Sequence, residues 1–173
     1  MSTVHIRPYE TSDAGPLFEA AVESIDDVHP WLPWCHPGYA RYEAESWIAL
    51  QLENWRSRTE FQFAVVSTSG RFLGGCGING INGEHKFANL GYWVRSSAAG
   101  AGAATAAVGK LRDWATENTD LERLEIVVAS GNVRSARVAE KAGALLEGTL
   151  RARLLLHGRS HDAFMYSLVR TDS

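Results

Sequence analysis

The chain has few cysteines, no long apolar run and no excess of basic residues. Each of these absences excludes a class of protein. Its two cysteines, Cys35 and Cys76, have no metal-ligand spacing. No apolar run approaches the roughly 18 residues that a membrane span needs. The first ten residues also lack the apolar core of a secretory signal. We therefore expect a cytoplasmic protein with reduced thiols, no metal and no membrane partner.

The charge balance argues against a dedicated nucleic-acid binder. The net charge is −3, whereas a protein of that class carries a basic face. A hydrophobic fraction of 45% and a charged fraction of 21% are typical of ordinary globular proteins. With 173 residues and no internal repeat, the sequence predicts a single domain over residues 1–173.

Hydrophobic periodicity alternates between that of strands and that of helices along the chain. The predicted strands are 4–7, 61–66, 71–78, 88–94, 121–130, 144–156 and 161–169. The predicted helices are 10–24, 39–58, one from about 102 to 114, and 132–143. The order β-α-α-β-β-β-α-β-α-β-β predicts an α/β fold with a mixed sheet.

The segment DDVHPWLPWCHPG holds three of the five prolines, so we expect no regular structure there. Its indoles, Trp31 and Trp34, either fold back onto the core or form a rigid apolar wall at the mouth of a substrate pocket. Glu23, Asp26 and Asp27 precede this wall. They are either solvated or attract a cationic amine, and the residues alone leave both interpretations open.

The segment WVRSSAAGAGAATAAVGKL runs from a strand into a helix through Gly100 and Gly102. Glycines at such a place let consecutive N–H groups point at an anion, and the helix dipole favours negative charge there. A tight structural turn explains the same glycines. The segment is not a P-loop, because no Lys-Ser/Thr follows the glycines, and Thr105 stands where the GxGxxG fingerprint has its third glycine.

Four ordered motifs together resemble one enzyme family. LGYWVRSSAAGAGAATAA resembles the acyl-CoA-binding signature of the GNAT N-acetyltransferases, in particular the RimJ/RimL-like branch. NVRSARVAEKAG with the following Glu-Gly, and HGRSHDAFMYSLV, are similar to the next two elements of that branch. HPWLPW is similar to its Trp-rich substrate loop. The resemblance spans nearly the whole chain.

The resemblance implies a site for acetyl-CoA. It implies that the coenzyme A pyrophosphate is bound by the backbone amides of Gly100, Ala101, Gly102, Ala103 and Ala104.

It also implies that the strand edge at Tyr92, Trp93 and Val94 pairs with the pantetheine arm, in a slot where two strands splay apart. Asn132 would hydrogen-bond this arm, and Ser135 would face the departing sulfur as the catalytic residue. Read without the family, Asn132 and Ser135 are capping residues of a short helix.

The chain departs from the family pattern at three positions. Ala99 and Ala101 replace residues that are often polar or basic, so side-chain help for the phosphates is missing. Arg95 either compensates or is a solvated strand end. Asn89 stands where relatives often have Glu, so a carboxylate base is absent at that position.

The resemblance implies transfer of an acetyl group from acetyl-CoA to a primary amine by direct attack in a ternary complex. Trp31, Trp34 and Asn89 would line the acceptor side. We expect the α-amine of a protein N-terminus or of a small amino-acid-like molecule. An α-amine has a pKa near 7.7–8.0, against about 10.4 for lysine, and so needs a base less. The alternatives are a coenzyme A sensor with little catalysis and an interaction domain that keeps the fold. Because relatives are often dimers, a homodimer is also expected.

Overall fold

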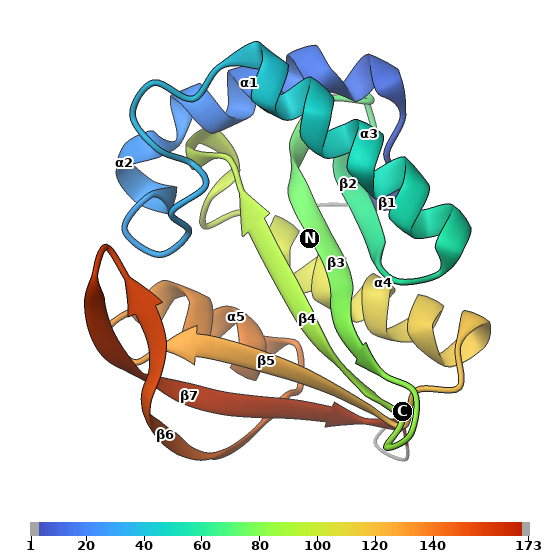
Figure 1. The fold of residues 1–173 in the computed structure, drawn as a ribbon, viewed down its shortest axis with the longest axis vertical. Coiled ribbons are helices and arrows are strands. Elements are labelled where there is room, and N and C mark those ends of the chain that lie inside the picture. Colours follow the sequence, from blue (N-terminus) through green and yellow to red (C-terminus); the bar gives the residue numbers. More distant parts are fainter. Residues whose placement is uncertain (1–3, 171–173) are drawn as a thin grey trace.

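The structure is a computed structural model and describes residues 4–170 (Figure 1). The strands are β1 (Val4–Pro8), β2 (Phe61–Ser67), β3 (Phe72–Asn82), β4 (Phe87–Val94), β5 (Arg123–Ala129), β6 (Leu145–Leu156) and β7 (Arg159–Val169). The helices are α1 (Ala14–Glu23), α2 (Ile25–Val28), α3 (Arg41–Ser57), α4 (Ala103–Asn118) and α5 (Val133–Lys141), with short 3-10 turns η1 (Thr11–Asp13) and η2 (Ser96–Ala98).

The seven strands form one sheet in the order β1-β2-β3-β4-β5-β7-β6. Only the central pair, β4 and β5, runs parallel, and every other neighbouring pair is antiparallel. Helices α1 and α3 cover one face of the β1–β4 half, and α4 and α5 lie against the opposite face (Figure 1). The chain thus has two faces on which a site can be built, and they meet where β4 adjoins β5.

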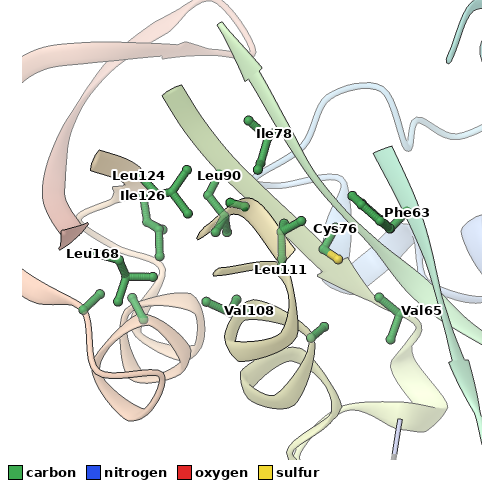
Figure 2. Close-up of a cluster of buried hydrophobic side chains, with 14 of the residues drawn as sticks. Phe63, Val65, Cys76, Ile78, Leu90, Val108, Leu111, Leu124, Ile126 and Leu168 are labelled. Carbon is green, nitrogen blue, oxygen red and sulfur yellow. The ribbon is translucent and has the colours of Figure 1, made fainter. Parts of the chain in front are cut away.

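Alanines let α4 pack closely against the sheet. Ala103, Ala107, Val108 and Leu111 form its buried stripe, at most 2% exposed. In Figure 2, Val108 and Leu111 lie close to sheet residues such as Leu90. Because these side chains are small or well packed, the N-terminus of α4 is held firmly near the end of β4.

The mixed α/β fold predicted from the sequence is confirmed, with two differences in its elements. Residues expected to lack regular structure include helix α2, whose turn is closed by the bond from Val28 N to Ser24 O (2.9 Å). The helix ends before Pro30, and a bond from Leu32 N to Val28 O (2.8 Å) spans the proline, whose missing N–H is not needed there. Helix α4 ends at Asn118 rather than near residue 114, because Ala115 still packs into the core (3% exposed).

Candidate functional site

The parallel strands β4 and β5 separate after three pairs. Their register runs Phe87↔Arg123, Ala88↔Leu124 and Asn89↔Glu125, and no later pair joins them within residues 4–170. Farther along, β4 stays paired with β3, while β5 stays paired with β7 (Figure 1). The second half of β4 therefore presents a backbone edge toward the gap, where an extended chain bearing amides can add as a strand.

A glycine turn follows this edge at the start of α4. Gly100 and Gly102 have φ angles of 78° and 83°, in the left-handed region that favours glycine. A Cβ added to either residue meets no atom within 4 Å, so the turn borders open space. The first helical bond runs from Ala106 N to Gly102 O (3.0 Å), which leaves the preceding amides outside the helical ladder. This geometry fits an anion such as a pyrophosphate.

Arg95, the cation nearest to this turn in sequence, forms hydrogen bonds away from the turn. Arg95 donates from Nε to Glu23 Oε2 (2.9 Å) and from Nη1 to the Phe72 carbonyl (3.2 Å), and its side chain is 12% exposed. Glu23 also accepts from Ser97 N (2.8 Å). The Arg95 and Ser97 hydrogen bonds lower the pKa of Glu23 to about 2. Arg95 therefore braces the turn against α1, and an anion bound at the turn would rely on backbone N–H groups.

A second acidic residue links three elements beside the gap. Asp27 accepts hydrogen bonds from the Ser96 hydroxyl and from Arg134 Nη1, the latter at 2.9 Å. These two bonds lower the pKa of Asp27, with Ser96 contributing most. Asp27 thus ties α2 to both η2 and α5. In this structure Glu23 and Asp27 form ion pairs with arginines of the chain itself, an outcome that neither interpretation of the sequence included.

Tyr92 reaches from β4 to the first turn of α5. The Ser135 hydroxyl donates to the Tyr92 hydroxyl (3.0 Å), and the Tyr92 hydroxyl donates to the Ser135 carbonyl (2.8 Å). Burial raises the pKa of Tyr92 to about 12, so this phenol stays protonated at neutral pH. Asn132 accepts from Ser135 N (3.1 Å), as expected of an N-cap. The Ser135 side chain is thus held by a phenol and does not cap the helix.

Sequence reasoning assigned Tyr92 a backbone role and missed its phenol. Tyr92 and Ser135 are 43 positions apart, and no local pattern signals their contact. Only the divergence of β4 from β5, together with the placement of α5 beside it, brings the two hydroxyls together.

Asn89 and Trp93 lie on the other face of β4. Strand alternation places them opposite Leu90 and Tyr92, on the side covered by α1 and α3. Asn89 Nδ2 donates to Asn79 Oδ1 (3.0 Å), so a neutral amide pair occupies this part of the sheet.

The two loop tryptophans lie against different sides of the gap. Trp34 packs edge-on to Trp93 of β4, with ring centroids 5.2 Å apart, and remains 38% exposed. Trp31 lies against Gly131, after β5, with a ring atom 3.3 Å from the position of an added Cβ. The Trp-rich loop therefore borders the gap from β4 across to the turn that precedes α5.

The described residues contain no group of three or more His, Cys, Asp or Glu able to hold a metal ion. Cys35 and Cys76 are buried thiols, and burial raises the pKa of Cys35 to about 11. Within residues 4–170, no helix is long and apolar enough to cross a membrane.

A sheet that opens beside a glycine turn at a helix start defines a class of proteins that bind a phosphate-bearing coenzyme with its arm along the open strand. The chain belongs to the family described as Acetyltransferase (GNAT) domain, whose sequence model matches residues 3–145.

Individual relatives agree with this membership over nearly the full chain. The Bacillus subtilis (strain 168) protein named "Putative ribosomal N-acetyltransferase YdaF" is 28% identical, over 98% of this chain and 92% of its own length. The structure of Mycobacterium smegmatis RimJ in complex with CoA-disulfide is 26% identical, with a TM-score of 0.91 over 99% of this chain and 84% of its own. A crystal structure of a "Probable acetyltransferase" is 27% identical, with a TM-score of 0.90 over 98% of this chain and 94% of its own.

These findings confirm the predicted RimJ/RimL-like membership and the GNAT fold. The chain is an acetyl-CoA-dependent N-acetyltransferase.

Proposed function

We propose that the enzyme acetylates an α-amino group, that of a protein N-terminus or of a small amino-acid-like molecule. The observation that carries this proposal is the gap between β4 and β5, which opens toward the glycine turn on one side and the Trp-rich loop on the other. A donor lying in this gap has its thioester within reach of an amine from the α1–α3 face.

Different residues of the chain bind different parts of coenzyme A. The amides of Gly100, Ala101, Gly102, Ala103 and Ala104 take the pyrophosphate of coenzyme A.

The open edge at Tyr92, Trp93 and Val94 pairs with the amide groups of the pantetheine arm. Asn132 contacts this arm beside its capping bond to Ser135. Arg95 contributes by fixing the turn that carries the amides, through its ion pair with Glu23.

The reaction is a direct acyl transfer. The amine lone pair forms the new C–N bond, and when the tetrahedral intermediate collapses the C–S bond breaks and its electron pair leaves with sulfur. A backbone N–H near Val94 stabilises the oxyanion. The Ser135 hydroxyl donates to the Tyr92 hydroxyl in the free enzyme. Because it has a single proton, it turns that proton from Tyr92 to the leaving sulfur when coenzyme A departs. The proton of the ammonium passes to water.

The acceptor is inferred from residue 89, where an amide stands in place of a carboxylate; Glu125, opposite it on β5, is bonded to Arg123 Nε (2.9 Å). Asn89 is paired with Asn79 and offers no base, which favours an amine that is already partly neutral at physiological pH. Trp31 and Trp34 would contact the residue that carries this amine. The name of YdaF, a putative ribosomal N-acetyltransferase, supports a protein acceptor. A cytoplasmic location and a homodimer stay predictions.

A coenzyme A sensor is the second candidate. Ala99 and Ala101 bring no charge to the turn, and Arg95 is held by Glu23, so affinity for the coenzyme rests on the backbone. An interaction domain without ligand is the third.

Calorimetry with acetyl-CoA, followed by coenzyme A release with an amine panel, separates the three. Binding with turnover above the hydrolysis background is expected. Binding without turnover would favour the sensor, and absence of binding the interaction domain.

A further inference from the structure

Tyr9 carries a buried hydroxyl that has no hydrogen-bond partner. Tyr9 follows β1 and is 3% exposed, and its Oη and His29 Nδ1 are the two buried side-chain polar atoms in residues 4–170 without a partner. A buried hydroxyl normally finds a partner, because leaving it unpaired costs the full loss of its hydration. An unpaired phenol therefore points to a group that the free protein lacks.

The hydroxyl lies over a glycine of β3 and near an indole of β4. A Cβ added to Gly75 would be 2.5 Å from Tyr9 Oη and 3.0 Å from Trp93 Nε1. The two polar atoms are therefore at most about 5.5 Å apart, the sum of these distances. One oxygen at about 2.8 Å from each can accept hydrogen bonds from both. A side chain at position 75 would collide with the Tyr9 hydroxyl, so glycine at this position lets the two donors lie close to the strand.

Both groups are donors at neutral pH. The indole N–H has no other hydrogen-bonding mode, and no residue among 4–170 accepts from Trp93 Nε1. Burial raises the pKa of Tyr9, which keeps its proton in place. The nearby charges, Arg7 and Asp13, are joined by two bonds of 2.7 Å and are thereby neutralised. The donors thus suit a neutral oxygen better than a carboxylate.

The position of these donors relates them to the acceptor. Trp93 directly precedes Val94, near which the oxyanion is placed, and its ring lies on the α1–α3 face. Aromatic rings line the approach: Trp34 at the exposed rim is 5.2 Å from Trp93, and Phe72 is 6.2 Å from both Trp93 and Tyr9. The two donors therefore lie in an aromatic cluster that reaches the surface at Trp34.

We propose that Tyr9 Oη and Trp93 Nε1 form an acceptor subsite that binds a neutral oxygen carried by the N-terminal residue being acetylated. The oxygen is either the first peptide carbonyl or a side-chain hydroxyl. The inference rests on the proposed function, because it needs the amine to arrive from this face. It also explains how the enzyme distinguishes acceptors, because an amino group is common to all of them and the neighbouring oxygen is not.

The test compares Tyr9→Phe with the wild type on three probes: Ala-Ala-Ala-amide, Ser-Ala-Ala-amide and propargylamine. Propargylamine lacks an oxygen, and its alkyne lowers the basicity of its amine toward that of an α-amine. Loss of one neutral hydrogen bond lowers kcat/KM about threefold to tenfold on the oxygen-bearing probes. The rate with propargylamine stays unchanged. A loss on both peptides identifies the carbonyl, and a loss on the serine peptide alone identifies the hydroxyl. Trp93→Phe, which removes the second donor, is expected to act on the same probes.

Stability and affinity give readouts that need no acceptor. Tyr9→Phe removes an unpaired polar atom, so its Tm should equal or exceed that of the wild type, and its Kd for acetyl-CoA should not change. Tyr42→Phe, the same chemical change at a residue 68% exposed on α3, is the matched control and leaves all rates unchanged.

Three results would overturn the subsite. A lower Tm for Tyr9→Phe would show that the hydroxyl has a partner in the free protein. Equal slowing of propargylamine and the peptides would show a general disturbance. Unchanged rates on all three probes with an active wild type would exclude this oxygen site and leave the proposed function intact. A wild type that acetylates none of the probes, with or without acetyl-CoA binding, would instead overturn the proposed function and the subsite with it.

Discussion

The two faces of the sheet that meet at the β4–β5 gap offer a ligand different groups: mainly backbone on one face and mainly side chains on the other. On the α4–α5 face, the proposed coenzyme site consists mainly of backbone: a strand edge and a turn made by Gly100 and Gly102. On the α1–α3 face, the proposed acceptor site consists of side chains, chiefly aromatic, gathered from β1, β4 and the Trp-rich loop. A backbone site suits a ligand shared by a whole family, whereas side chains can change from one acceptor to another.

This difference makes the two sites separable by mutation. Substitutions on the α4–α5 face should change acetyl-CoA affinity or the chemical step, and those on the α1–α3 face should change acceptor kinetics. The predictions that follow run from the largest expected effect to the smallest.

Gly102→Glu should abolish measurable acetyl-CoA binding. The added side chain enters open space at the turn, where its carboxylate occupies the anion site and repels pyrophosphate. Because φ is 83°, any side chain also strains the backbone, so Gly102→Gln is the matched control with the same shape and no charge. Calorimetry should show weakened binding for Gln and none for Glu. Unchanged affinity in a folded Glu variant would show that the turn is structural only.

Ser135→Ala should lower kcat about tenfold to a hundredfold with little change in acetyl-CoA affinity. Acid assistance is typically worth about 10²–10⁴-fold, and a serine hydroxyl assisting a thiolate lies at or below the low end of that range. The backbone amide of residue 135 still bonds Asn132, so the helix cap is retained. Single-turnover rates are the measurement, and an unchanged rate under conditions where chemistry is limiting would leave Ser135 a purely structural residue.

Tyr92→Phe should lower kcat by up to about tenfold, because it frees the Ser135 hydroxyl. If the phenol acts through Ser135, the two effects are not multiplicative. The double variant should then turn over as slowly as Ser135→Ala alone. Multiplying effects would instead assign Tyr92 a role independent of Ser135. Tyr166→Phe, which removes a phenol bonded to Glu140, serves as the control.

Glu23→Gln should destabilise the fold by about 1 kcal/mol or less, since the ion pair with Arg95 is partly exposed. The pKa of Glu23 is lowered from 4.5 to about 2, so its contribution is fully present above the unfolded value. It is lost as the pH falls from about 4.5 toward 2. Denaturant titrations should therefore separate the variant from the wild type at pH 7 and bring them together at pH 2. A constant difference would contradict this assignment.

The difference between a site built from local backbone and one built from distant side chains also explains how much of each could be predicted from the sequence. The glycine turn and the Asn132 cap were predictable because each depends on neighbours within a few positions. The contact of Glu23 with Arg95 spans 72 positions, and it was not predictable.

The donors above Gly75 also depend on strand register. Gly75 faces Trp93 only because β3 and β4 pair as they do, and Tyr9 arrives from the end of β1. Hydrophobic alternation predicts such strands but does not fix which residues face one another across them. The elements of the proposed coenzyme site were therefore predictable from the sequence, and most of those of the proposed acceptor site were not.

Competition between two peptides tests the central claim most directly. One peptide has a free N-terminus and no lysine, and its twin has a blocked N-terminus and one internal lysine. Both are mixed with acetyl-CoA at pH 7.4, and the products are quantified by mass spectrometry. Because the site lacks a carboxylate base at Asn89, the free N-terminus should be acetylated faster. Faster acetylation of the blocked lysine peptide would contradict the account and would require a base elsewhere in the gap.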